Sequence, residues 1–200
     1  MTKMTLATAR AFANEASRGG LSALGNVLRA LINDEVRDIP VAGVGITGGT
    51  GTIYKSSVHR RGDIITTSIL LDLTGLSSST TDLDVIGQGT VPAHLGQITA
   101  AINGTILGGK VICLEAPVGG VTDIDIYTAT VGTRDFDEGI AALDEVAIVT
   151  AAAAWTIERE EAFTGIPRPN DYLYLTGGAA GTAAAYTAGK FLIELYGYDA

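Results

Sequence analysis

The sequence has little of what cross-linked, exported or membrane proteins carry. Of its 200 residues one is cysteine, and aromatic residues make up 6%. A single thiol cannot form a disulfide within the chain, so the fold does not require an oxidising compartment. No run approaches the ~20 apolar residues of a membrane-spanning helix, and the first ten residues lack an apolar export segment. These absences predict a protein synthesised in the cytoplasm and without a membrane partner.

Basic residues are also scarce. There are 13 lysines and arginines against 22 acidic residues, which gives a formal net charge of −9. This balance repels phosphate backbones and argues against nucleic acid as a partner. A partner with a basic patch, or another copy of the chain, fits the charge better.

What the sequence does contain is typical of short strands and many turns. Glycine occurs 26 times, threonine and serine recur in clusters, and 46% of residues are hydrophobic. A core built mainly from valine, isoleucine, leucine and alanine suits β-structure. The length allows one full hydrophobic core, so we expect a single β-domain over residues 39–200.

Residues 1–38 differ from the rest of the chain. Apolar residues recur there at spacings of three and four, which favours helix, broken at Gly19-Gly20. The alternative is an extended arm that orders against a neighbouring subunit. In either case we expect this segment to contact a partner through its apolar anchors Phe12, Leu21, Leu24, Leu28 and Leu31.

Eight segments after Val41 have the alternation or apolar character of strands. The first two flank Arg61-Gly-Asp63 and predict a hairpin. Residues 151–155 are ambiguous between a helix and an extension of the preceding strand. The pattern predicts an all-β fold, a single antiparallel β-sandwich or jelly-roll-like domain with an N-terminal helical or extended arm. The predicted strands are residues 52–59, 64–73, 97–103, 110–116, 122–128, 145–150, 172–175 and 190–196.

Two short motifs match functional patterns but are better explained by turns. Gly43-Val-Gly-Ile-Thr-Gly48 matches a dinucleotide-binding loop, yet the Gly49-Thr-Gly that follows is unsuited to the helix which that mechanism needs. Arg61-Gly-Asp63 spells an adhesion motif, but glycine and aspartate also belong in a hairpin turn. We therefore predict no bound cofactor.

The reactive side chains do not form a recognisable catalytic set. His59 and His94 lie in different predicted elements, and a hydrolase site on either one is an alternative that sequence leaves open. Cys113 lies in an apolar strand and is expected to be a buried small side chain. Asn103-Gly-Thr105 is a glycosylation sequon, although nothing directs the chain to a glycosylating compartment.

Carboxylates occur in close pairs. Asp123 and Asp125 are two apart in a predicted strand, so they should line one solvated polar face. Asp135-Phe-Asp-Glu138 is the best calcium candidate, but the calcium-loop pattern is absent and we predict no metal site. The charged segment 158–161 and the proline-stiffened loop 166–170 are either solvated connections or partner contacts.

The C-terminal segment carries a family resemblance. Leu175-Thr-Gly-Gly178 and Ala188-Gly-Lys-Phe-Leu-Ile-Glu-Leu-Tyr-Gly197 resemble virion structural proteins of marine tailed bacteriophages, and the resemblance extends over the β-region from about Val41. Among these proteins, the size, acidity and β-character look most like a capsid decoration or cement protein. The resemblance implies a non-enzymatic protein on the capsid exterior of the virion. It would bind the major capsid protein and other copies of itself, with a trimer expected.

One other virion role stays open at this point. A phage tail, head-fibre or receptor-binding subunit would have a similar composition, and its acidic strand faces could then bind glycans or calcium. Neither role assigns a catalytic residue by motif.

Overall fold

The structure, a computed structural model, describes residues 39–199. The predicted N-terminal arm, and with it Phe12, Leu21, Leu24, Leu28 and Leu31, lies outside the described residues. Within residues 39–199 the structure is mostly antiparallel β-sheet, so the all-β prediction is confirmed. The jelly-roll part of that prediction is not tested and stays a prediction.

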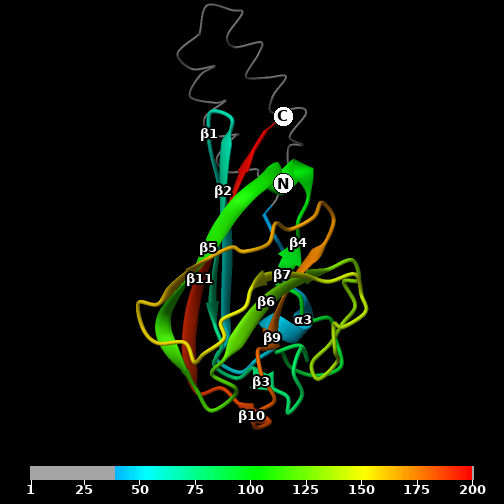
Figure 1. The fold of residues 1–200 in the computed structure, drawn as a ribbon, viewed down its shortest axis with the longest axis vertical. Helices are drawn as coiled ribbons and strands as arrows, with labels where there is room; N and C mark the ends of the chain where they lie inside the picture. Colours follow the sequence, from blue (N-terminus) through cyan, green and yellow to red (C-terminus); the bar gives the residue numbers. More distant parts are fainter. Residues whose placement is uncertain (1–38, 200) are drawn as a thin grey trace, which may run out of the picture. The chain divides into compact units, whose positions relative to one another are not determined.

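The larger sheet has five strands in the order β1-β2-β11-β5-β8. They are β1 (Ile53–Arg61), β2 (Ile64–Asp72), β11 (Ala188–Tyr198), β5 (Thr105–Val118) and β8 (Glu160–Ala162). The predicted hairpin is confirmed, because β1 and β2 pair antiparallel from Ile53↔Asp72 to Arg61↔Ile64. Gly62, with φ of +64°, makes the tight turn between them. Figure 1 shows this hairpin extending beyond the smaller sheet.

The smaller sheet has four strands in the order β4-β9-β6-β7. They are β4 (Gly96–Gln97), β9 (Tyr172–Gly177), β6 (Ile124–Ala129) and β7 (Val146–Val149). A separate pair joins β3 (Ser77–Ser78) to β10 (Ala184–Ala185). Residues 151–155 are neither helix nor strand, so both sequence interpretations of that segment were wrong.

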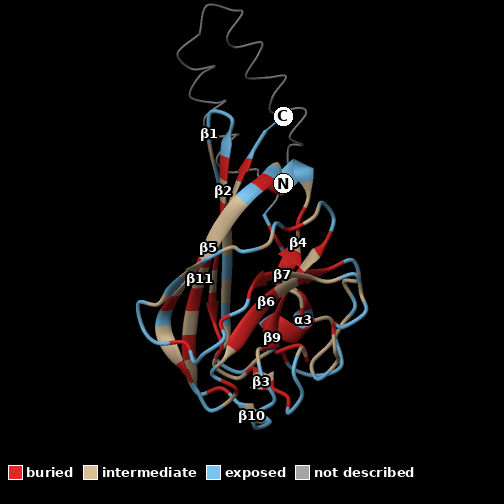
Figure 2. Ribbon diagram, in the orientation of Figure 1, coloured by how far each residue is buried: buried red, intermediate tan, exposed pale blue. Residues whose placement is uncertain are grey.

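The two main sheets share one hydrophobic core. Inward side chains alternate along β2 and β11, whereas β6 and β9 are buried on nearly every residue. Figure 2 shows the buried residues gathered on the smaller sheet, with exposed residues at the hairpin tip and in the loops. Members of the core from both sheets include Ile69, Val111, Ile193, Ile126 and Leu175.

The predicted strand at residues 97–103 was wrong beyond its first residue. After β4 the chain forms the one-turn helix α4 (Ala100–Asn103), because the Thr99 side chain accepts a hydrogen bond from the Ile102 amide and caps it. The Asn103 side chain is buried and donates from Nδ2 to the Thr67 hydroxyl at 2.9 Å. In the folded protein the Asn103 side-chain amide is therefore buried and hydrogen-bonded, so it is not accessible as a glycan acceptor.

The motif Gly43–Gly48 was expected to be a flexible turn and instead contains one helical turn, whereas the residues from Gly49 onward open no helix, as predicted. Residues Val44–Thr47 form the one-turn helix α3, which buries Ile46. A Cβ at Gly43 would lie 2.1 Å from the Pro92 carbonyl oxygen, and one at Gly45 would lie 2.6 Å from that of Val91. Glycine is required at both positions because this segment of backbone lies directly against the backbone of Val91 and Pro92. The sequence motif alone does not show this contact.

Candidate functional site

The described residues contain an apolar surface close to their N-terminal end. Backbone hydrogen bonds from Gly43 to His94 and from Gly45 to Pro92 hold the segment after Ile39 against residues 91–94. Four large apolar side chains are exposed along these two segments, with Val41 at 72% and Val44 at 62%. We call them the apolar patch: Ile39, Val41, Val44 and Val91.

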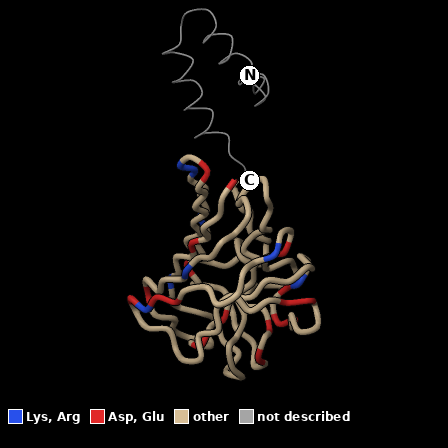
Figure 3. The backbone as a smooth tube through the Cα atoms, turned by 45° about the horizontal axis from the view of Figure 1, so that its top comes forward, with Lys and Arg blue, Asp and Glu red and all other residues tan. Residues whose placement is uncertain are grey.

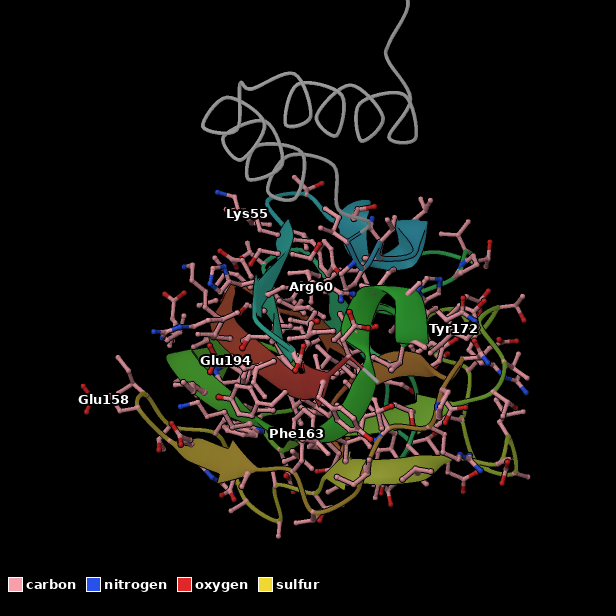
Figure 4. The ribbon with its side chains drawn as sticks, turned by 90° about the horizontal axis from the view of Figure 1, so that it is seen from above. Lys55, Arg60, Glu158, Phe163, Tyr172 and Glu194 are labelled. Atoms are coloured by element: carbon pink, nitrogen blue, oxygen red, sulfur yellow. The ribbon has the colours of Figure 1, made fainter. Side chains whose placement is uncertain are left out.

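A cavity of about 410 Å³ opens beside this patch. Its walls are mainly apolar and include Ile39, Val41, Ile102, His94 and Tyr172. Figure 4 shows Tyr172 on the opposite side of the view from Glu194. A cavity of this size and lining can receive an apolar side chain or a short segment of a partner.

His94 has an unusual environment in this cavity wall. Its ring lies edge-on to those of Tyr172 and Tyr174, with centroid distances of 4.9 and 6.3 Å. Burial lowers its pKa below the ordinary histidine value, so the neutral ring is favoured. Its Nδ1 is buried and has no hydrogen-bond partner among the described residues. His59 instead lies at an exposed position of β1.

Cys113 is fully buried, as the sequence predicted. It lies on β5, and its Sγ approaches the Glu115 carbonyl oxygen at 3.3 Å. Burial raises the pKa of the thiol, which keeps it protonated and unreactive at neutral pH.

The prediction of a solvated Asp123/Asp125 face was wrong. Asp125 is buried, because the chain after β7 covers this face of β6 and the Ala151 amide donates to its Oδ1 at 2.7 Å. Burial raises the Asp125 pKa, and the negative charges of Asp123 and Asp82 add to that effect. Asp123 is half-buried.

A second group of carboxylates lies on two adjoining loops. The loops are held together by a bridge between Asp84 and Gly139 and by hydrogen bonds between Val85 and residues 137–138. We call their four aspartates the acidic loop pair: Asp82, Asp84, Asp135 and Asp137. Across residues 39–199 no three His, Cys, Asp or Glu side chains are grouped so that they could hold a metal ion, and this includes the calcium candidate 135–138.

One hydroxyl serves two carboxylates within the acidic loop pair. Ser79 Oγ lies 2.7 Å from Asp84 Oδ2 and is also hydrogen-bonded to Asp137 Oδ1. A serine hydroxyl has one hydrogen, so it can donate to only one of the two carboxylates at a time. The loops therefore carry negative charge that their own hydrogen bonds do not fully compensate.

Several basic side chains lie on β1, which is an edge strand of the larger sheet. Side chains alternate along β1, and Tyr54 and Ser56 point inward to bond the Leu95 and Pro40 carbonyls. The outward positions include Lys55, His59 and Arg61, which we call the basic row. Figure 4 shows Lys55 at the periphery of the view, and Figure 3 shows charges gathered at the hairpin tip and in the loops.

The charged segment at residues 158–161 is not simply solvated, because its Arg159 side chain is held by contacts with the neighbouring loop. Arg159 donates to the carbonyls of Ala151, Ala153 and Ala154 and lies 4.9 Å above the Trp155 ring. One arginine thus fixes the whole 151–158 loop, with Glu158 at its outer end in Figure 4. Residues 166–170 are held by Arg168, which bonds Asp171 and Asp144.

Comparisons with protein-family models, with curated proteins and with solved structures find no match to this chain. Across the described residues, no helix has the length and apolar character needed to cross a membrane.

Sequence reasoning missed the surfaces that the structure presents most openly. Of the apolar patch, only Val44 lies within the glycine motif considered for cofactor binding, and the fold brings Val91 to it from a distant segment. The basic row was detectable, because residues 53–61 alternate and their odd positions carry the unpaired charges. The Ser79 contact to two carboxylates joins residues 58 positions apart and had no sequence signal.

Proposed function

We propose that this protein is a non-enzymatic structural protein of a phage virion that binds the outer capsid shell and stabilises it as a homo-oligomer. The apolar patch is the observation that supports this proposal most directly. Exposed apolar side chains that gather beside a cavity mark interaction sites, since solvent contact with them costs free energy that a partner surface relieves.

The position of the patch along the chain supports the same role. It begins at Ile39, immediately after the segment for which sequence predicts an apolar arm. The patch and the predicted arm would each contribute apolar contacts from every copy. Many copies on a symmetric shell multiply modest contacts, and bound copies favour the assembled shell by mass action.

The β-architecture suits this role. Two sheets over one core give a rigid body whose surface positions are fixed by long-range strand pairing. Arg159 adds rigidity by fixing a long loop to Trp155. A rigid body loses little conformational entropy when it docks, so more of the contact free energy appears as affinity.

Co-sedimentation with undecorated capsids tests the proposal. The full-length protein should bind saturably, and removal of residues 1–38 should abolish binding. Full-length protein with both Val41→Ser and Val44→Ser should bind about 10- to 100-fold more weakly, because two apolar contacts are lost. Ile157→Ser is the matched control, since Ile157 is equally exposed at 64% but lies on the 151–158 loop.

Two results would contradict the proposal. Absence of saturable binding over a range of salt concentrations would reject shell binding and direct the search to tails, glycans and divalent metals. Equal weakening by Ile157→Ser and by the patch variant would reject the apolar patch as the contact.

A further inference from the structure

The cations of the basic row are exceptional among the described residues. Six basic side chains form ion pairs with carboxylates of their own chain. Lys55 and Arg61 are the two within residues 39–199 that form none, and both point outward from β1. The six paired residues are Arg60, Lys110, Arg134, Arg159, Arg168 and Lys190.

The row has the dimensions of a small binding surface. At about 3.3 Å per residue along a strand, Lys55 and Arg61 are about 20 Å apart, with His59 between them. Ile53 lies on the same face at one end, and Ile64 lies opposite Arg61 at the other. Both isoleucines are exposed, so apolar contacts flank the cations on this face.

The acidic loop pair is the surface on the same chain that complements this row. It adjoins the smaller sheet, because Val85, the residue after Asp84, forms a β-bridge with Thr176 of β9. Asp82 and Asp137 are exposed there. Neither of these two carboxylates forms an ion pair with a basic side chain of residues 39–199, so an incoming cation would meet negative charge that the chain itself does not pair.

We propose that the basic row on β1 of one copy docks on the acidic loop pair of a second copy. The two halves are different surfaces, so the contact is heterologous and repeats from copy to copy until a ring closes. Charge complementarity selects the pairing and sets the orientation, while Ile53 and Ile64 contribute apolar area.

This inference deepens the self-association within the proposed function and rests on it. It names the surfaces through which copies meet, whereas the apolar patch is assigned to the shell. Self-association is measured on the protein alone, without capsids. A failure of self-association and a failure of shell binding are therefore separate results.

Sedimentation velocity of full-length variants at low salt tests the contact. Lys55→Gln with Arg61→Gln should remove the basic half, and Asp82→Asn with Asp137→Asn should remove the exposed charges of the acidic half. Each double variant should weaken association by about tenfold or more and shift the protein to monomer. Raising the salt concentration should weaken the wild-type oligomer, because the cations are exposed.

Mixing the two double variants gives the decisive result. Each retains one intact half, so the mixture should form one-to-one dimers that grow no further. Arg60→Gln is the matched control, because Arg60 lies on the same strand but is paired with Asp199, and it should leave the oligomer unchanged.

Three outcomes overturn the inference. The first is a wild-type protein that is monomeric throughout. The second is an oligomer that persists in the Lys55/Arg61 variant. The two cations would then serve only to prevent aggregation through the exposed edge of β1. The third is the absence of dimers in the mixture, which would exclude a heterologous contact between these two surfaces.

Discussion

Replacing Tyr186 by phenylalanine removes one oxygen atom from a buried hydroxyl. Tyr186 is 1% exposed, and its hydroxyl donates to the Val121 carbonyl oxygen at 2.7 Å. Phenylalanine keeps the ring and its packing, so the substitution removes only the hydrogen bonds of the hydroxyl, to Val121 and to the Ser78 side chain. The backbone of Gly120 lies directly against the ring, which hinders any shift that could restore a partner for the carbonyl.

The expected cost follows from that geometry. Leaving a buried acceptor without its donor costs about 1–3 kcal/mol in the free energy of unfolding. At about 3 °C per kcal/mol for a chain of this size, the melting temperature should fall by about 3–9 °C. The Tyr196 hydroxyl bonds the half-exposed Glu194 carboxylate, where water can replace it. Tyr196→Phe should therefore cost less than about 0.5 kcal/mol.

Urea denaturation measures both variants with one probe. Trp155 is the only tryptophan and is buried, so its fluorescence reports unfolding of the core directly. The free energies are compared by linear extrapolation with a common slope. A loss below about 0.5 kcal/mol for Tyr186→Phe, or an equal loss in both variants, would refute the argument that burial decides the value of this hydrogen bond.

Three further predictions use the same measurement or a close relative of it. Asp125→Asn keeps the acceptor oxygen and removes a charge whose folded pKa is raised, so wild-type stability is lost as pH rises through that pKa. The variant should be more stable than wild type at pH 7 and not at pH 3, and lower stability at pH 7 would contradict the sign. Gly62→Ala and Gly75→Ala both place alanine at positive φ, but a Cβ at Gly75 would meet a backbone oxygen at 2.4 Å whereas Gly62 has free space. Gly62→Ala should lower the free energy of unfolding by about 1 kcal/mol and Gly75→Ala by clearly more. Equal losses in the two variants would contradict this prediction. Arg159→Met should increase amide exchange across residues 151–158 without unfolding the sheets, and unchanged exchange would show that Trp155 packing holds the loop by itself.

The sequence alone determined the elements whose cause is local. The β1–β2 hairpin follows from alternation on both sides of a two-residue turn, and β5, β6, β7, β9 and β11 lie where apolar runs predicted strands. The burial of Cys113 was likewise predictable, because it lies in an apolar strand segment. In each case the chemistry of a few adjacent residues decides the outcome.

Tertiary structure decided the features that depend on distant neighbours. Asp125 alternates with isoleucines as an exposed residue would, yet it is buried because the chain near Ala151 crosses its face of the sheet. The Gly43–Gly48 motif reads as a loop, but its glycines serve a close approach to Val91 and Pro92.

The charges show the same division most clearly. The sequence gives each charge and its place along the strand, and so indicates the basic row. Which cations are neutralised depends on carboxylates far along the chain, as when Arg60 pairs with Asp199 while Lys55 and Arg61 face solvent. Coulomb interactions act over a few ångströms of space, and only the packing of strands distant in sequence fixes those distances.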